Sequence, residues 1–432
     1  MSNFDAQGRF TAPVNVVDPS TMINNFTADG RFVQPVMLID PTTGLPYSPS
    51  SGGGGGGAPA AYLGQVATRS YAPTANYTGA TMIQSRTGHW ARDAITSLQL
   101  NFSNWWIKSG SGDTDNTAAA TIKATIEYPA GTYTRVTFGA SQTGSWTTGD
   151  ILSDAVAVVI PKGAKFWVRS LYTCSAGIIY TGFLTNEPNG DGAETGTALT
   201  DKTGGGALAA GTNFYFPTAI VAQTSNPSVF LPGDSIMKGQ LDTFDDLVSD
   251  QGVVARSVGP YMGYCNAGCT GDTTAALVAS HGRRVALSQY FSHIVCNYGG
   301  PNDQTVATAT VQAGLVAAGA YWPAGKKRFL CTYVPHSTST DSFATVANQT
   351  SSGLAYFQAM NQFVRTTPQN WDGFVDPAKV VESAPYSNLW APPSPNGGGA
   401  LTSDGTHPIT LGNQLIARSD TIRHEMFSRA LP

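Results

Sequence analysis

Charged side chains are scarce in this sequence, and the basic ones do not cluster. Asp, Glu, Lys and Arg together make up 12% of the 432 residues, which is about half of the usual share in globular proteins. The formal net charge is −4, whereas nucleic-acid binding requires clustered Lys and Arg side chains that neutralise phosphates. The composition therefore argues against a nucleic-acid partner. A surface rich in Gly, Ser, Thr and Ala instead is typical of extracellular or virion-associated β-rich proteins, and we expect such a location.

Long apolar runs are missing as well. No apolar stretch reaches the roughly 18 residues that a membrane-spanning helix needs. Residues 1–5 show neither the basic start nor the apolar segment of a secretory signal. We therefore expect no membrane span and no signal peptide.

The five cysteines predict neither a disulfide framework nor a zinc site, because their number is odd and no CxxC spacing occurs. Cys265 and Cys269 leave two interpretations open, a local disulfide or small buried thiols, and the second is favoured. No HExxH or similar histidine pair is present, so the sequence predicts no metal and no other cofactor.

A repeat opens the chain. Residues 4–10 recur at 26–32, and every matched pair is 22 positions apart, as positions 4 and 26 are. Two interpretations stay open for this arm over 1–50. It is either a docking tag that joins the chain to a homo-oligomer or a larger assembly, or an irregular extension. The glycine run within 51–60 predicts a flexible linker.

Residues 61–212 show the pattern of an all-β domain. Segments such as 121–128 alternate apolar and polar side chains, as half-buried strands do. We predict a β-sandwich of jelly-roll type, an architecture that often binds carbohydrate. The expected strands are 97–108, 120–128, 133–138, 155–160, 165–173 and 177–183.

Two features of this domain have alternative explanations. The acidic segment 112–116 is either a calcium loop or, as favoured, a solvated loop. Four tryptophans are either stacking faces for a sugar or, as favoured for each of them, part of the core: Trp105, Trp106, Trp146 and Trp167.

Residues 225–432 follow a second glycine-rich linker and have a different periodicity. Short apolar runs alternate with helix-like stretches, and this alternation predicts a parallel sheet with helices on both faces. Ligand sites in open parallel sheets lie outside the carboxyl ends of the strands. The expected strands are 229–231, 293–298 and 328–334, and the expected helices are 241–249, 273–287, 305–321, 354–365 and 411–427.

Four short blocks lie at the ends of these strands or at the starts of these helices. They are Gly-Asp-Ser-Ile at 233–236, Asn-Ala-Gly-Cys-Thr-Gly-Asp-Thr at 266–273, Gly-Gly-Pro-Asn-Asp at 299–303 and Asp-Gly-Thr-His-Pro at 404–408. Together they supply a serine nucleophile, a histidine base that follows a carboxylate, and further groups that can hold an oxyanion. Acyl transfer to water needs those parts and little else.

Three of these residues are predicted to form a triad. Ser235 is the nucleophile, His407 is its general base, and Asp404 orients the imidazole ring. The chain order Ser-Asp-His also occurs in α/β-hydrolases. Their G-x-S-x-G elbow is absent here, however, because Met237 stands where the second glycine belongs.

The four blocks, in this order, resemble the SGNH hydrolases, also called the GDSL esterase/lipase family. The resemblance runs from about residue 226 to the C-terminus and implies a three-layer, flavodoxin-like α/β fold with a parallel sheet. It also implies an oxyanion hole made of the backbone N–H groups of Ser235 and Gly271 and the side-chain amide of Asn302. Gly268 competes with Gly271 for this role, but the family pattern places the glycine directly before an Asp-Thr pair.

The predicted function is a serine esterase that hydrolyses short acyl esters, O-acetyl groups above all, on a small molecule or a polysaccharide. The absence of a long apolar lid-like segment disfavours long acyl chains. One alternative is a phage-tail-like or cell-surface glycan-binding protein with an accessory deacetylase domain, and another is a lipase or thioesterase of the same family. A catalytically silent module is disfavoured, because none of the expected site residues is missing.

Overall fold

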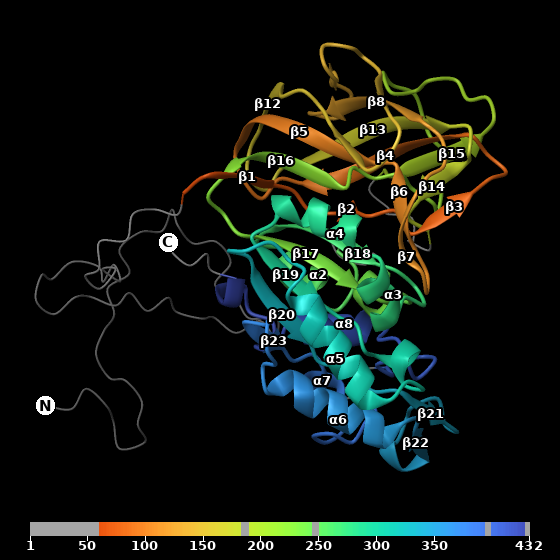
Figure 1. The fold of residues 1–432 in the computed structure, drawn as a ribbon. Coiled ribbons are helices and arrows are strands. Elements are labelled where there is room, and N and C mark those ends of the chain that lie inside the picture. Colours follow the sequence, from red (N-terminus) through yellow and green to blue (C-terminus); the bar gives the residue numbers. More distant parts are fainter. Residues whose placement is uncertain (1–59, 183–189, 244–249, 394–398, 428–432) are drawn as a thin grey trace, which may run out of the picture. The chain divides into compact units, whose positions relative to one another are not determined.

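The computed structural model describes residues 60–182, 190–243, 250–393 and 399–427, and Figure 1 shows its ribbon. The repeat arm over 1–50 and most of the linker over 51–60 lie outside the described residues. Contacts divide the chain into Met1–Gly57 and Ala58–Pro432. The finer boundaries at 212 and 225 stay predictions. None of the described helices is both long and apolar enough to cross a membrane.

Two antiparallel sheets form the first part of the described chain (Figure 1). One has the strand order β1-β16-β5-β11, with β12 also on β5. The other has the order β10-β8-β13-β4-β15, with β9 on β8. The bounds are β1 Tyr62–Gln65, β4 Met82–Trp90, β5 Ile95–Ser103, β8 Ala120–Glu127, β9 Tyr133–Arg135, β10 Gly144–Trp146, β11 Asp150–Leu152, β12 Val156–Ile160, β13 Lys165–Cys174, β15 Gly192–Gly196 and β16 Ala219–Thr224.

Side chains from both antiparallel sheets share one hydrophobic core. Phe102 of β5, Ile126 of β8 and Val168 of β13 all belong to it and are fully buried. Strand β12 alternates strictly between buried and exposed residues, as expected for a strand with one face on a core. The connections that would make these sheets a jelly roll stay a prediction.

The second part contains a parallel sheet with the order β2-β18-β17-β19-β20-β23. Each neighbouring pair in it is parallel. Helices pack on both faces: Phe230 shares a core with Leu315, whereas Val229 and Leu231 share another with Val258. The bounds are β2 Ser70–Tyr71, β17 Ser228–Gly233, β18 Gly263–Gly268, β19 His293–Cys296, β20 Lys327–Cys331 and β23 Gly373–Val375.

The helices differ from the expected ones mainly in length. The expected helix over 273–287 is two short helices, and that over 411–427 is a helix followed by a 3-10 turn. Most of the expected helix over 241–249 lies outside the described residues. The bounds are α1 Ser235–Lys238, α2 Ala255–Val258, α3 Thr274–Ala279, α4 Gly282–Leu287, α5 Thr308–Gly319, α6 Leu354–Arg365, α7 Ala378–Val381 and α8 Thr410–Ala417, with the 3-10 turn at His424–Phe427.

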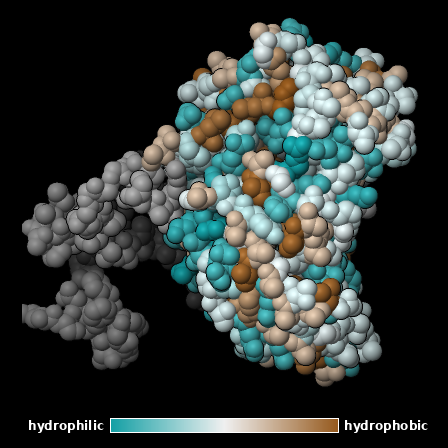
Figure 2. Space-filling view, in the orientation of Figure 1, coloured by the Kyte–Doolittle hydropathy of each residue, from teal (hydrophilic) through white to brown (hydrophobic). Residues whose placement is uncertain are grey.

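Each of the two parts contributes a strand to a sheet of the other part. Strand β2 comes from the region expected to be wholly antiparallel, yet Ser70 and Tyr71 pair in parallel with β18. Strand β16 follows the second glycine-rich linker, yet it pairs with β1 and β5. Residues on both sides of the expected linker therefore contribute to both sheet systems. Figure 2 shows the resulting surface, in which apolar residues form short bands between polar ones.

A hairpin of β6 (Trp105–Lys108) and β7 (Gly112–Asp115) packs against helices α3 and α4. The hydroxyl of Ser280 donates to the carbonyl of Asp113 at 2.7 Å, and the carboxylate of Asp113 accepts the backbone N–H of Arg284 at 2.9 Å. This contact lies at Ser280, where the expected single helix is interrupted. The acidic segment 112–116 is expected to be a calcium or solvated loop, but residues 112–115 form strand β7, because they pair with β6. The carboxylates of Asp113 and Asp115 bind Arg284 and Arg283 of the second part.

Arg284 makes two buried ion pairs. Its side chain is fully buried and lies 2.6 Å from the carboxylate of Asp113 and 3.0 Å from that of Asp272. Breaking a buried ion pair by removing one partner typically costs about 3–5 kcal/mol, because the remaining charge stays uncompensated. The hairpin is therefore firmly attached to the loop that contains Asp272.

Substitution of two glycines of the hairpin tests how tightly it packs against helix α3. Gly112 has a φ of +82°, and a Cβ there would lie 2.5 Å from the carbonyl oxygen of Ser280, whereas Gly110, with a φ of +67°, has open space around it. We expect Gly110→Ala to cost about 1–2 kcal/mol of unfolding free energy from backbone strain alone. Gly112→Ala should cost about 1–3 kcal/mol more, because the hairpin must move away.

Urea unfolding of both variants measures this difference, with Gly110→Ala as the matched control. Equal losses of stability in the two variants would show that the hairpin does not pack tightly against helix α3.

Candidate active site

The site begins where the central strand of the parallel sheet ends. Strand β17 stops at Gly233, and Ser235 is the first residue of helix α1. The carboxylate of Asp234 caps this helix by accepting the backbone N–H of Ile236 at 2.8 Å. A Cβ on Gly233 would lie 2.5 Å from the Cβ of Met237, so only glycine fits this sharp strand-to-helix turn. The turn places the Ser235 hydroxyl at the carboxyl edge of the sheet.

Two hydrogen bonds join Ser235, His407 and Asp404. The Nε2 atom of His407 lies 2.7 Å from the hydroxyl oxygen of Ser235, and its Nδ1 atom lies 2.7 Å from Oδ2 of Asp404. Because a carboxylate oxygen can only accept, Nδ1 carries the hydrogen. Nε2 is then the acceptor for the Ser235 hydroxyl. The structure thus brings together three residues that the sequence blocks single out.

The loop of Asp404 is held by its own backbone. Oδ1 of Asp404 accepts the N–H groups of Thr406 and His407, each at 2.9 Å. Gly405 has a φ of +80°, and a Cβ there would collide with the carbonyl oxygen of Ser337. The tight turn therefore needs glycine, and it returns the His407 ring to the carboxylate three residues earlier.

Electrostatics keep Asp404 ionised. Burial alone would raise the pKa of its carboxyl, but the hydrogen bonds from the ring and backbone of His407 and from Thr406 outweigh burial. They hold this pKa well below its usual range. The ionised carboxylate fixes the Nδ1–H tautomer of His407 and can stabilise an imidazolium.

Two further carboxyl groups of the four blocks, those of Asp234 and Asp303, are buried. Burial raises the pKa of Asp234 to about 7, although the Ile236 N–H and His407 oppose this shift. Asp303 accepts the N–H and hydroxyl of Thr274 and the N–H of Gly299, and burial raises its pKa too. Asp303 thereby joins the third block to Thr274, the first residue of helix α3.

The second and third blocks meet at Asp272. The side-chain amide of Asn302 donates to the carbonyl oxygen of Asp272 at 3.0 Å. Gly271 has a φ of +75°, and the hydroxyl oxygen of Ser109 lies 2.7 Å from where its Cβ would be. The tip of the β6–β7 hairpin therefore lies beside Gly271. Asn302 is exposed, so its amide is accessible to a ligand.

The competing glycine of the second block has different surroundings. Gly268 is buried, and a Cβ there would collide with the backbone nitrogen of Lys238 and lie 2.9 Å from the carbonyl oxygen of Asp234. It therefore faces the underside of helix α1. Gly271 is instead the glycine that lies in the same loop as the Asp272 carbonyl bonded to Asn302.

Sequence reasoning missed Asp113, Arg284 and Tyr298. The carboxylate of Asp272 binds Arg284 and accepts the Tyr298 hydroxyl at 2.8 Å, and Arg284 binds Asp113 of the hairpin. These residues fix the loop that carries Gly271. No short motif could reveal them, because Asp113 lies in another sheet system.

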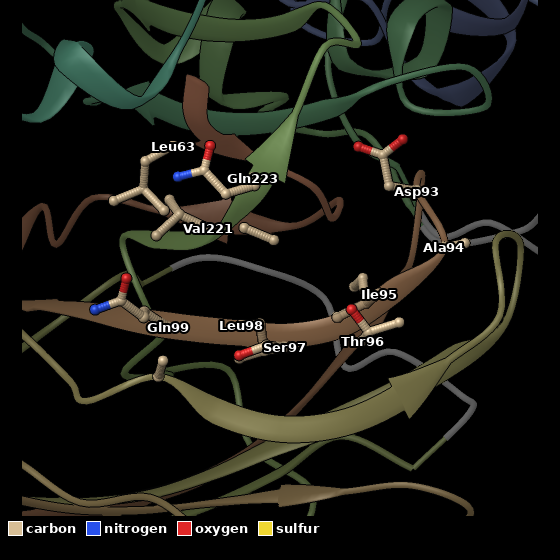
Figure 3. A pocket seen from close by; sticks show the side chains of 12 residues that line it. Leu63, Asp93, Ala94, Ile95, Thr96, Ser97, Leu98, Gln99, Val221 and Gln223 are labelled. Atoms are coloured by element: carbon tan, nitrogen blue, oxygen red, sulfur yellow. The ribbon is translucent and has the colours of Figure 1, made fainter. Parts of the chain in front are cut away.

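A separate cavity of about 380 Å³ lies on the antiparallel sheets (Figure 3). Figure 3 shows Thr96 and Gln99 on β5, and Gln223 on β16, around it. No aromatic side chain lines it, so none of the four tryptophans offers a sugar-stacking face there.

All four tryptophans contact other parts of the protein, and Trp106 and Trp146 pack, partly buried, against the core of the antiparallel sheets. Trp105 is fully buried, with its indole N–H donating to Asp150 at 2.8 Å, and it belongs to the core. The ring of Trp167 has the cations of Arg86 and Lys165 within 4.2 and 5.2 Å of its centre. Basic side chains therefore lie against this ring.

Within the part of the chain that the structure describes, no group of three or more His, Cys, Asp or Glu residues is arranged to hold a metal ion. All five cysteines are buried and free, so the local disulfide between Cys265 and Cys269 is not formed.

Comparison with known proteins gives structural neighbours only. No protein-family model matches the chain, and no curated protein matches it. A family two carbohydrate esterase from Cellvibrio japonicus is 9% identical and covers 85% of this chain and 94% of its own, with a TM-score of 0.27. A peptidoglycan O-acetylesterase is 9% identical and covers 83% and 73%, with a TM-score of 0.31.

A third neighbour, AlinE4, is described as an SGNH-hydrolase family esterase, which is the family that the four sequence blocks resemble. It is 18% identical and covers 34% of this chain and 74% of its own, with a TM-score of 0.22.

Proposed function

We propose that this protein is a carboxylic ester hydrolase of the SGNH type, with Ser235, His407 and Asp404 as its triad. The observation that carries the proposal is the pair of 2.7 Å hydrogen bonds on the two ring nitrogens of His407. A serine hydroxyl is a weak nucleophile until a base accepts its proton, and an oriented histidine is such a base. A merely structural histidine would not need a serine on one nitrogen and an ionised carboxylate on the other.

The reaction follows from this geometry. Ser235 Oγ attacks the ester carbonyl carbon while its proton passes to Nε2 of His407, and the carbonyl oxygen becomes an oxyanion. The intermediate expels the alcohol, which takes the proton back from His407, and an acyl-serine remains. Water then attacks the acyl carbon with His407 again as base. The acid leaves, and Ser235 regains its proton.

Three donors are proposed for the oxyanion: the backbone N–H groups of Ser235 and Gly271 and the side-chain amide of Asn302. The helix start at Ser235 supports the first, because the N–H groups of a first helical turn lack partners within the helix. The bond from Asn302 to the Asp272 carbonyl supports the others, because it places the Asn302 amide at the Gly271 loop. The Arg284 contacts to Asp272 and Asp113 keep this loop rigid, which preorganises the donors.

The proposed substrate is a short acyl ester, an O-acetyl group above all, on a carbohydrate or another polar alcohol. Polar side chains lie by the proposed oxyanion donors: Ser109 lies next to Gly271, and Gln304 follows Asn302 by two residues, directly after the third block. A site with polar neighbours favours a polar alcohol and gives a long acyl chain little apolar surface to bury.

Release of p-nitrophenol from p-nitrophenyl acetate tests the proposal. We expect Ser235→Ala to lower kcat by at least about 10⁴-fold, because the nucleophile is lost while the fold is kept. Ser403→Ala, an exposed serine of the Asp404 loop, is the matched control and should keep the wild-type rate.

A wild-type protein without activity, or a Ser235→Ala variant as active as wild type, would contradict the proposal. The same assay with p-nitrophenyl octanoate examines the acyl part. A clear preference for octanoate over acetate would rule out the short-acyl substrate and favour a lipase or thioesterase.

Asn302→Ala tests the oxyanion hole. We expect kcat to fall by about 10²–10³-fold with little change in KM, because the amide acts on charge that develops only in the transition state. Steady-state kinetics with p-nitrophenyl acetate measure this split. Asn348→Ala, which removes an exposed asparagine bonded to Asp341, serves as the control. A loss confined to KM would mean that Asn302 contacts the ground state only.

A further inference from the structure

His336 lies in the loop that follows strand β20, and both its backbone N–H and its backbone carbonyl are hydrogen-bonded. Its N–H donates to Oδ1 of Asn388 at 2.8 Å, and its carbonyl accepts Nδ2 of Asn388 at 2.9 Å and the N–H of Ser352 at 2.8 Å. Asn388 itself is buried. This residue therefore has a fixed position, as a ligand-contacting side chain needs.

Two contacts place His336 between the third and fourth blocks. Its Nδ1 atom lies 3.1 Å from Oε1 of Gln304, which follows Asn302 by two residues. The next residue, Ser337, donates its N–H to the carbonyl of Gly405 at 2.9 Å, inside the loop between Asp404 and His407. His336 therefore lies between the loop that follows Asn302 and the loop that carries His407.

The hydrogen bond to Gln304 sets the tautomer. Burial lowers the pKa of His336, His407 lowers it further, and Asp404 only partly opposes this, so the ring is neutral at neutral pH. Because Oε1 of Gln304 only accepts, the hydrogen sits on Nδ1 and the Nε2 atom has a free lone pair. No residue in the described ranges hydrogen-bonds Nε2, and the ring is only half-buried, with Phe357 edge-on at 5.7 Å.

We propose that Nε2 of His336 accepts a hydrogen bond from a hydroxyl group on the alcohol part of the ester, so that the site selects esters of polyols such as partly acetylated sugars. This inference rests on the proposed function and names the substrate class of that same site. A free acceptor on a neutral ring, held between the third and fourth blocks, is matched by a hydroxyl, which donates. An ether or a hydrocarbon at that place would leave it unpaired, and sites built to bind a hydroxyl reject analogues that lack it.

The experiment measures binding without turnover. In the Ser235→Ala background, calorimetry compares a mono-O-acetylated methyl glycoside with the same ester whose remaining hydroxyls are O-methylated. We expect the hydroxylated ester to bind about tenfold more tightly, which corresponds to one well-formed hydrogen bond. Adding His336→Asn should abolish this preference, because asparagine can replace Nδ1 but does not reach the Nε2 position. Adding His336→Gln, whose amide oxygen reaches that position, should restore part of it.

His281→Asn is the matched control. His281 is also half-buried, but it stacks on Tyr321 at 3.7 Å, between helices α3 and α4, so the preference should be unchanged. Thermal unfolding of each variant shows whether it is folded. Equal binding of the two esters, no measurable binding of the hydroxylated one, or a preference that survives His336→Asn in a folded protein would each overturn the inference. Failure of the proposed function is seen separately, as absence of p-nitrophenyl acetate hydrolysis by the wild-type protein.

Discussion

The two hydrogen bonds of the His407 ring are the constraint on which the rest of the site depends. They join Asp404, three residues earlier, to Ser235, which is 172 positions away. To meet this requirement, the chain must end β17 at a residue without a side chain and start a helix directly afterwards. It must also turn at Gly405 through a backbone conformation that glycine adopts most readily. The glycines required at the end of β17 and at position 405 therefore both follow from the position of the His407 ring.

The β6–β7 hairpin, which comes from the first part of the chain, contributes to this site. Arg284 is buried between Asp113 of the β6–β7 hairpin and Asp272 of the second block, and the carbonyl of Asp272 holds Asn302. Ser109 at the tip of the same hairpin lies against Gly271. A domain that merely carried the second part to its target would not need fully buried charges at their contact. We infer that the hairpin keeps the Gly271–Asn302 region rigid, so that its donors need little reorganisation during the reaction.

The sequence was most informative where its signals are local. Gly-Asp-Ser-Ile and Asp-Gly-Thr-His-Pro are turns whose geometry depends on their own residues, so the grouping of Ser235, Asp404 and His407 could be anticipated, while their catalytic roles stay proposals. Helix α6 has its expected bounds, because its apolar residues recur with a helical period. The break between α3 and α4 could not be foreseen, because it is fixed by the Ser280–Asp113 contact across 167 positions. Strand β2 has only two residues, and β18 reads Gly-Tyr-Cys-Asn-Ala-Gly, which lacks the β-branched residues that indicate a strand.

The central claim is that Ser235 is a nucleophile activated by His407, and covalent labelling tests it most directly. A fluorophosphonate reacts with an activated serine, forming a phosphorus–oxygen bond and releasing fluoride, and peptide mass spectrometry locates the label. The account predicts a single label per chain, on Ser235, and no label when His407 is replaced by alanine. A protein that stays unlabelled, or one labelled at another serine, would contradict it.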